Sequence, residues 1–467
     1  MLPALAAAQP PALSRADSGL ILRILTAEDR RDSTDTALAE GVRHADERIR
    51  RLAQRARWRI GDGRFAARDS LPALPSPPLW AEPAWRLRYR ALTPKSDCAE
   101  VRSALTDSVW AVRLHAADLV TPACTGDEQI AIALRSWIDE LPKNTSRRSR
   151  DGVSWHGAAH AIVALARLRK EDARARATAL SRNRQWELRM YATRALADLA
   201  DTVRLRALAG DADANVKEAA ITALSKLVGH DGDDLYVAAL ESPDAQAARA
   251  AALALKGSKR ADVHAAANQA FTQWAKRNVS SARDVRVALL EAAGRPDTDD
   301  QPPVQTHTLP RDVVRLALGQ SVLLRVVMSP ASGGATFMVR LRGDVAPIMA
   351  ARILSLARQH YNDGGHWHRV EADFVIQGAG PGTNEYVGYE QYFRDELGNV
   401  PHVRGTVGMS TRSHDTGDAQ WFINLRDNLR LNRDYTVFAE IVDGIDVVDG
   451  ILEGDVVQRI SEVRRGR

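Results

Sequence analysis

The segment WHRVEADFVIQG at positions 367–378 brings together a permanent cation, an aromatic ring and an amide. These are Arg369, Phe374 and Gln377, with Val375 between the last two. Side chains two positions apart on a strand share a face, so Val375 and Gln377 would line one surface. A guanidinium can donate several hydrogen bonds, and a ring beside it can enclose an apolar group. Such a set could bind and polarise a neutral group without a nucleophile or a metal, whereas a lone arginine on a strand would be an ordinary surface cation.

Two further segments follow in order. The first consists of GTVGMS at 405–410 and AQWFI at 419–423, with Met409 and Gln420 standing 11 residues apart, and the second is LNRDYTVF at 431–438. Together the three segments resemble the cyclophilins, whose signatures are Phe-His-Arg-x-x-x-x-Phe-x-x-Gln-Gly, Gly-x-x-x-Met-Ala with Ser-Gln-Phe-Phe-Ile, and Leu-Asp-Gly-x-x-x-Val-Phe. The resemblance covers residues 321–463.

This resemblance implies a peptidyl-prolyl cis/trans isomerase that acts on proline-containing protein clients without a cofactor or a metal. Amide resonance gives the X–Pro bond a barrier of about 18–20 kcal/mol, and a donor aimed at the imide nitrogen weakens that resonance. By resemblance the catalytic residues are Arg369, which is the donor, Phe374 and Gln377. Residues implied to line the proline pocket or to hold the substrate backbone are Val375, Ser410, Thr411, Gln420, Phe422, Leu431 and Tyr435.

More specific roles also follow from the resemblance. Ser410 and Thr411 would offer backbone groups to the residues before the proline, and Gln420 would position its neighbours. Four positions depart from the family pattern. Thr411 replaces an asparagine, Tyr435 a histidine and Arg430 the tryptophan that helps to bind cyclosporin, while Ala372-Asp373 replaces a Pro-Gly pair before Phe374. The catalytic set is intact, so we expect activity to survive. Because Arg430 replaces the tryptophan, we expect sensitivity to cyclosporin to be weak.

Other chemistry-bearing patterns have plainer interpretations. His366 and His368 could ligate a metal from one strand face, but no third ligand is evident nearby. His156 and His160 lie four apart on a predicted helix without the glutamate of a HExxH motif, which favours a packing role. Gly378 to Gly382 mimics a phosphate loop, but Pro381 interrupts it and no Lys-Ser/Thr follows, so we expect a loop at the rim of the substrate cleft.

The elements beyond residue 310 are mostly predicted strands. Apolar and β-branched runs predict strands at 321–328, 335–341, 367–377, 405–409, 420–424 and 436–442, and residues 346–360 predict one amphipathic helix. Many short strands and a single helix indicate a closed or nearly closed β-barrel with flanking helices.

The preceding half has a helical and recurring pattern. An aliphatic residue, a cation and an alanine four positions on recur at 49–53, 112–116, 188–192, 216–220 and 248–252, and several copies follow a capping aspartate such as Asp213 or Asp244. Spacings of 28 and 32 residues between the later copies fit one antiparallel helix pair each. This pattern resembles HEAT repeats and predicts an α-solenoid.

The predicted organisation is therefore multidomain: an all-α HEAT-like solenoid followed by a cyclophilin-like β-barrel. The expected boundaries are a disordered or signal-peptide remnant at 1–14, the solenoid at 15–296, a proline-rich linker at 297–310 and the isomerase domain at 311–467. A proline-rich loop at 70–88 would cross the solenoid. We expect the solenoid to bind clients or a protein partner. The alternative is a catalytically weak scaffold or adaptor that binds proline peptides.

Composition and charge exclude several classes of protein. Of 467 residues, 26% are charged and 45% apolar, which is ordinary for a globular chain, and the net charge is only +5. The sequence contains no run of about 18 apolar residues, so it predicts no membrane span. The arginine run at 147–150 and the pair at 464–465 lack interleaved aromatics, so we expect no nucleic-acid partner.

Two features bear on location. The start MLPALAAAQPPALS resembles the end of a signal peptide, which favours a periplasmic or exported protein, with the cytoplasm as the alternative. Cys98 and Cys124 stand 26 residues apart, close to one helical repeat. They would form a disulfide between adjacent repeats in an exported protein, or remain two buried inert thiols.

Overall fold

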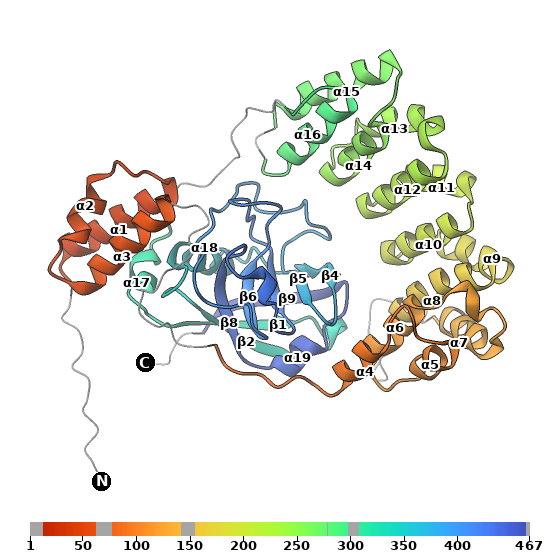
Figure 1. Cartoon of the computed structure of the whole chain (residues 1–467), viewed down its shortest axis with the longest axis horizontal. Coiled ribbons are helices and arrows are strands. Elements are labelled where there is room, and N and C mark those ends of the chain that lie inside the picture. Colours follow the sequence, from red (N-terminus) through yellow and green to blue (C-terminus); the bar gives the residue numbers. More distant parts are fainter. Residues whose placement is uncertain (1–12, 62–76, 142–154, 278, 298–307, 464–467) are drawn as a thin grey trace, which may run out of the picture.

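The structure is a computed structural model that describes residues 13–61, 77–141, 155–277, 279–297 and 308–463. Its buried apolar residues form two separate cores. One runs through the helices between residues 85 and 293, and the other lies inside the C-terminal barrel and extends into the first three helices of the chain. The helical array curves around one side of the barrel, and the first three helices lie on the other side (Figure 1).

The helical array is a stack of short helices. Helices α8, α10, α12, α14 and α16 contact one another in series, and α9, α11, α13 and α15 pack behind them. This arrangement is the one expected of an α-solenoid. The helices are α4 (Trp85–Ala91), α5 (Cys98–Ala104), α6 (Trp110–Asp118), α7 (Glu128–Asp139), α8 (Trp155–Leu168), α9 (Lys170–Leu180), α10 (Trp186–Asp198), α11 (Thr202–Leu208), α12 (Ala214–Leu227), α13 (Asp233–Ala239), α14 (Ala245–Leu255), α15 (Ala261–Trp274) and α16 (Ala282–Ala292).

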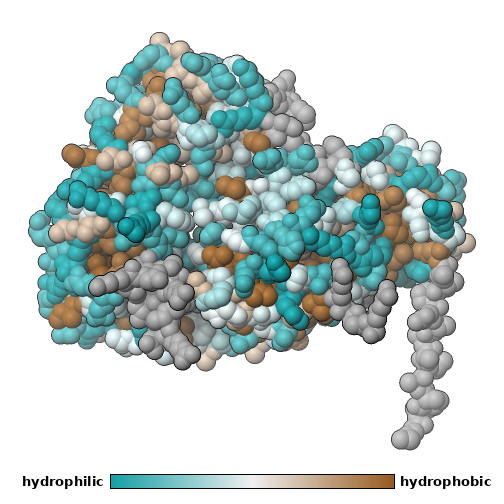
Figure 2. All heavy atoms as spheres, turned by 180° about the vertical axis from the view of Figure 1, so that it is seen from behind, coloured by the Kyte–Doolittle hydropathy of each residue, from teal (hydrophilic) through white to brown (hydrophobic). Residues whose placement is uncertain are grey.

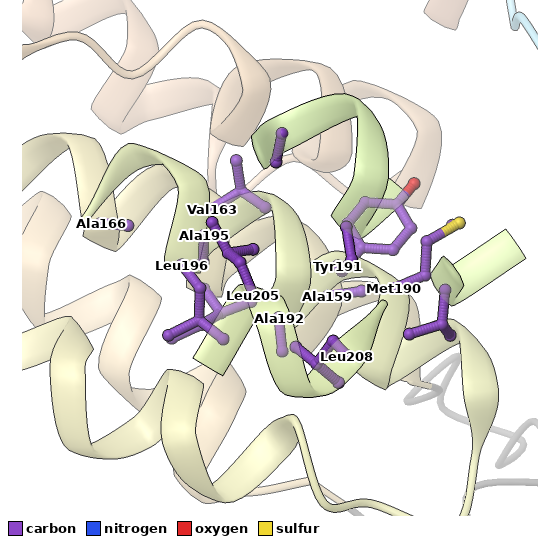
Figure 3. Packing of buried hydrophobic residues seen from close by; sticks show 14 of the residues in the cluster. Ala159, Val163, Ala166, Met190, Tyr191, Ala192, Ala195, Leu196, Leu205 and Leu208 are labelled. Atoms are coloured by element: carbon purple, nitrogen blue, oxygen red, sulfur yellow. The ribbon is translucent and has the colours of Figure 1, made fainter. Parts of the chain in front are cut away.

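The recurring sequence pattern explains how these helices begin and pack. Asp213 and Asp244 accept hydrogen bonds from backbone amides in the first turns of α12 and α14, as expected of N-caps. Alanines let neighbouring helices approach closely, and leucines and valines fill the space between them (Figure 3). Residues drawn in this part of the core are Ala159, Val163, Ala166, Met190, Tyr191, Ala192, Ala195, Leu196, Leu205 and Leu208.

The two cysteines lie at the start of the array and form a disulfide. Cys98 begins α5 and Cys124 ends the short 3₁₀ helix η1 (Pro122–Cys124). Their sulfur atoms are 2.01 Å apart. The structure therefore has the disulfide form and not the pair of free thiols.

The barrel consists of nine strands in the order β3-β9-β1-β2-β8-β6-β7-β5-β4. Strand β3 also bridges to Gly380 just after β5, which nearly closes the sheet. The strands are β1 (Val322–Met328), β2 (Thr336–Leu341), β3 (His366–Trp367), β4 (Arg369–Val370), β5 (Val375–Gly378), β6 (Thr406–Met409), β7 (Trp421–Asn424), β8 (Val437–Asp443) and β9 (Asp455–Glu462), with helices α17 (Val313–Ala317), α18 (Pro347–Arg358) and α19 (Ile445–Asp449).

The predicted β-barrel is confirmed, and one strand was missed. Each predicted strand run contains a strand, and the predicted helix at 346–360 is α18. Strand β9 was not predicted, because Gln458, Arg459 and Glu462 interrupt its apolar alternation. It pairs antiparallel with β1 and lies between β3 and β1 in the sheet order.

The first three helices correct the predicted solenoid boundary at residue 15. Helices α1 (Arg15–Arg30), α2 (Thr36–Val42) and α3 (Glu47–Gly61) share the core of the barrel and not that of the solenoid. We call them the N-terminal bundle. The apolar face of α1, with Ile21 and Ile24 fully buried, continues into the barrel core beside α17. The bundle is part of the barrel domain because its apolar side chains are buried in the same core as those of the barrel.

Buried charges also join the bundle to the barrel. Glu28 accepts hydrogen bonds from Arg55 and Arg59, and Arg59 also donates to the carbonyl groups of Val345 and Leu397. Burial alone would raise the pKa of Glu28, but the two guanidinium groups outweigh it and lower that pKa to about 2. These contacts satisfy charges that would otherwise be costly to bury.

Several predictions fall outside the described residues. These are the N-terminal segment up to residue 12, most of the linker at 297–310, the first part of the proline-rich loop and the two arginine runs. Among the described helices, none is long and apolar enough to cross a membrane. On the face opposite to that of Figure 1, small apolar groups are scattered among hydrophilic side chains (Figure 2).

Candidate active site

Arg369 and Gln377 face each other across the antiparallel β4–β5 pair. Arg369 Nη1 donates to Gln377 Oε1 at 3.1 Å and Nε donates to Glu371 Oε1 at 2.9 Å, while Nη2 also contacts Glu371. The side chains of Arg369 and Glu371 are 47% and 50% exposed. An ion pair this exposed contributes only about 0–1 kcal/mol, so the guanidinium is free to turn toward another acceptor. Two neighbours therefore orient a cation that stays available to a ligand.

Phe374 lies in the turn between these strands. Its amide donates to the Glu371 carbonyl at 2.8 Å, and its carbonyl accepts from Leu425 N and Asn428 Nδ2, both at 3.0 Å. The guanidinium carbon of Arg369 is 6.0 Å from the ring centroid, and that of Arg430 is 4.4 Å away. The residue is half-buried, its backbone is fixed by these hydrogen bonds, and two cations lie near its ring.

Phe422 forms the apolar floor between the strands. On β7 it pairs with Gln377 of β5 and with Gly408 of β6. Its ring lies edge-on to Tyr435, with centroids 5.6 Å apart at 90°, and is stacked on His402 at 5.6 Å and 20°. A Cβ at Gly408 would lie 2.4 Å from the Phe422 ring, so only glycine leaves room for it. This packing fixes the orientation of the Phe422 ring, which forms the floor of the site.

Gln420, two residues before Phe422, supports a loop. It is 1% exposed, and its amide nitrogen donates to the carbonyl groups of Asn384 at 2.9 Å and Val387 at 2.8 Å. Its own carbonyl accepts from Ser410 N at 2.9 Å. Ser410 and Thr411 are both partly exposed at the end of β6. Gln420 thus joins the end of β6 to the loop at 384–387.

The predicted residues gather on adjoining strands to different degrees. Direct contacts or strand pairing join five of them: Arg369, Phe374, Gln377, Phe422 and Tyr435. Val375 is 3% exposed beside them on β5 and pairs with Asn424. Leu431 is partly exposed at the end of the 3₁₀ helix η4 (Leu429–Leu431).

The departure at Ala372-Asp373 has a structural explanation. Arg86 of α4 donates to the Ala372 carbonyl at 2.6 Å, and Arg90 donates to Asp373 Oδ1 at 2.9 Å. Arg426 reaches the other oxygen of Asp373 at 2.7 Å. The turn that carries Phe374 is therefore anchored to the first solenoid helix, and the two contacts made by the Asp373 carboxylate would be lost with a glycine at 373.

Sequence reasoning missed His402. It is fully buried beneath Phe422, its Nδ1 lies 3.2 Å from Asn424 Nδ2, and its Nε2 lies 3.2 Å from the Tyr435 carbonyl. Burial lowers its pKa to about 4, so the ring is neutral near pH 7. Its nearness to the GTVGMS segment was the only signal, because the contacts come from distant parts of the chain.

Arg412, directly after Thr411, was also missed. It donates to Asp284 of α16 at 2.8 Å and to the Tyr392 hydroxyl at 3.2 Å, and it contacts the Glu385 carbonyl. Its guanidinium carbon lies 5.2 Å from the Tyr386 ring centroid. The rim of the site at this end is thus tied to the last solenoid helix.

The histidine pairs lie outside this cluster. Burial lowers the pKa of His368 to about 4, and no hydrogen-bond partner of its ring is found among the described residues. His156 Nε2 lies 2.6 Å from the Glu453 carbonyl, so this histidine contacts the barrel as well as the solenoid. In the described ranges, no group of three or more His, Cys, Asp or Glu side chains could hold a metal ion.

The C-terminal part of the chain is similar to known proteins. Residues 326–464 match the family described as "Cyclophilin type peptidyl-prolyl cis-trans isomerase/CLD". A peptidyl-prolyl cis-trans isomerase of Helicobacter pylori is 32% identical over 119 residues, covering 25% of this chain and 74% of that protein. Peptidyl-prolyl cis-trans isomerase B of Escherichia coli is 34% identical over 125 residues, covering 24% and 76%.

A solved structure was also found. The crystal structure of a cyclophilin type peptidyl-prolyl cis-trans isomerase of Cryptosporidium parvum aligns with 32% of this chain and 100% of its own, at 19% identity and a TM-score of 0.29.

Proposed function

Because this chain belongs to the cyclophilin-type peptidyl-prolyl isomerase family, we propose that it catalyses cis/trans isomerisation of X–Pro bonds in polypeptide clients. The observation that carries the proposal is the half-exposed Arg369 guanidinium, held by Gln377 and Glu371 beside the Phe374 ring. The helical array is interpreted as a HEAT-like solenoid that contributes to client binding.

Rotation about the X–Pro bond needs charge placement and not bond cleavage. Amide resonance opposes rotation by about 18–20 kcal/mol, and the imide nitrogen regains its lone pair as the bond twists. A guanidinium donor aimed at that nitrogen stabilises the twisted state more than the planar one. Arg369 fits this role because it is permanently charged and its weak pairing with Glu371 is easily exchanged.

The remaining residues would hold the substrate on either side of this bond. The proline ring would lie against Phe422, bordered by Phe374, Val375 and Leu431, with Tyr435 fixing the edge of Phe422. Gln377 would bind the substrate backbone next to Arg369, and backbone groups of Ser410 and Thr411 would bind the residues before the proline. Gln420 would act through the loop that it supports.

The test compares the full chain with its Arg369→Ala and Arg369→Lys variants. Isomerisation of an Ala-Pro tetrapeptide is followed by NMR exchange, which needs no coupling protease. Loss of one preorganised donor typically costs a factor of about 10²–10³ in rate, and we expect a loss of this size for both variants. Lysine keeps the charge but cannot present the planar fork.

Arg459→Ala is the matched control. Arg459 is also a half-exposed arginine of a barrel strand, with Nε 3.5 Å from Asp363, but it lies on β9. We expect its activity to be unchanged. A folded full chain that binds the tetrapeptide without accelerating its isomerisation would refute catalysis and would favour the alternative of a proline-peptide scaffold.

A further inference from the structure

A cavity of about 440 Å³ lies between the far end of the solenoid and the barrel. The solenoid wall comes from the start of α14, the end of α15 and the connection to α16. The barrel wall is residues 386–390 of the loop after β5. Side chains that define it include Trp274, Arg277, Tyr386, Val387 and Glu390. We call it the interdomain cavity.

The interdomain cavity is held open by contacts on its borders. Ser280 N donates to the Glu390 carbonyl at 2.8 Å, and the Tyr392 hydroxyl donates to the Ser280 carbonyl. Asn215 of α12 donates to Thr383 at 3.0 Å and joins the loop after β5 to another solenoid helix. These hydrogen bonds therefore fix the solenoid wall and the barrel wall relative to each other.

Its barrel wall is supported by residues of the proposed substrate cleft. Gln420, which is 1% exposed, donates to the carbonyl groups of Asn384 and Val387. Arg412 follows Thr411 directly and contacts both the Glu385 carbonyl and the Tyr386 ring. The cleft and the cavity thus share one loop.

The lining suits a polypeptide segment. Val387 is 37% exposed, one of few large apolar side chains left at the surface, and Trp274 lies beneath Arg277, whose guanidinium carbon is 3.6 Å from the ring centroid. The carboxyl groups of Asp244 and Glu390 add polar groups around this apolar area. An apolar side chain flanked by basic or neutral polar residues would match these surfaces.

We propose that the interdomain cavity is a subsite for the client segment that precedes the X–Pro bond, with one wall supplied by the solenoid. This inference rests on the proposed function, since it uses the expected binding of the residues before the proline to Ser410 and Thr411. It assigns the solenoid a direct part in selecting long clients over short peptides. Peptides without this extension do not reach the cavity.

The experiment measures KM and kcat for three peptides with one Ala-Pro core. One is the tetrapeptide, one carries six residues of Leu, Lys and Ser before the core, and one carries the same six after it. Six extended residues span about 20 Å, enough to pass well beyond the cleft. With the wild-type full chain, we expect the first extension alone to lower KM about tenfold, with kcat unchanged.

Val387→Lys is the test variant, because it places a long cation in the cavity without removing any side chain of the proposed catalytic set. It should abolish the advantage of the preceding extension, measured against the tetrapeptide with the same variant. Val203→Lys is the matched control, since Val203 is 77% exposed on α11 away from the cavity, and it should behave as the wild type.

Three outcomes would overturn the inference. They are equal KM for the tetrapeptide and the peptide with the preceding extension, an advantage that survives Val387→Lys, and an advantage confined to the following extension. Calorimetry of the same peptides measures their dissociation constants, and so tests binding to the subsite independently of catalysis. If no peptide is isomerised, the proposed function fails, and tighter binding of the preceding extension that is lost in Val387→Lys would still support the subsite.

Discussion

Replacing Asp29 by alanine tests whether the N-terminal bundle is a structural part of the barrel. Asp29 of α1 and Arg352 of α18 form a doubly hydrogen-bonded ion pair, with distances of 3.0 Å from Nη1 to Oδ1 and 2.8 Å from Nη2 to Oδ2. Their side chains are only 2% and 4% exposed. Removing one partner of a buried pair takes the opposite charge away from the other, at a cost of about 3–5 kcal/mol.

The measurement is scanning calorimetry of the full chain. For a cooperative unit of about 150–250 residues, 1 kcal/mol shifts Tm by about 2–4 °C, so the barrel transition should fall by about 6–20 °C. The solenoid has its own core, and we expect its transition to move little. Glu40→Ala is the matched control on the same bundle, because its pair with Arg23 is 53% and 50% exposed and contributes about 0–1 kcal/mol.

A barrel transition lowered no more by Asp29→Ala than by Glu40→Ala would refute the coupling of bundle and barrel. A double variant, Asp29→Leu with Arg352→Met, distinguishes the two ways of failing. It replaces both charges by apolar groups, so most of the lost stability should return. A double variant as unstable as Asp29→Ala would mean that damaged packing, and not removal of the opposite charge, caused the loss.

Two other changes bear on the floor of the site. Gly408→Ala would place its Cβ 2.4 Å from the Phe422 ring, so we expect a displaced ring, a loss of about 1–3 kcal/mol in unfolding free energy and a fall in isomerase activity. Gly126→Ala, with nothing within 4 Å of the new Cβ, is the control, and unchanged activity of Gly408→Ala would contradict the packing argument. His402 has a pKa of about 4, below its unfolded value of about 6.5, so the unfolded chain binds the proton first and stability falls as pH drops through this window. Between pH 7 and pH 5 this histidine should cost about 2 kcal/mol, and urea unfolding of His402→Phe should show a pH dependence flatter by that amount; parallel curves would argue against a buried neutral imidazole.

Much of the barrel could be predicted because its patterns are local. Strand alternation and the helix at 346–360 depend on periodicities of a few residues, and each of those predictions found an element at its position. Strand β9 was missed because it carries charged residues at Arg459 and Glu462. Its position in the sheet depends on pairing with β1, more than 100 residues earlier in the chain. Pairing of that kind leaves little trace in a local pattern.

The candidate site divides in the same way. Arg369, Phe374 and Gln377 stand within nine residues of one another, and a single hairpin brings them together. The groups that hold them come from elsewhere: Arg90 anchors the turn before Phe374 from the solenoid, and His402 supports Phe422 from a separate loop. Because these partners are distant in sequence, only the folded chain identifies them.

The sequence by itself determined the family resemblance, the residue types of the site and the helical character of the first half. Only the tertiary structure decided that α1 to α3 belong to the barrel, that the solenoid reaches both rims of the site, and that a cavity lies between the domains. The physical reason is that a helix records its apolar face in its own sequence, but the surface that covers this face depends on complementary shape and charge elsewhere in the chain.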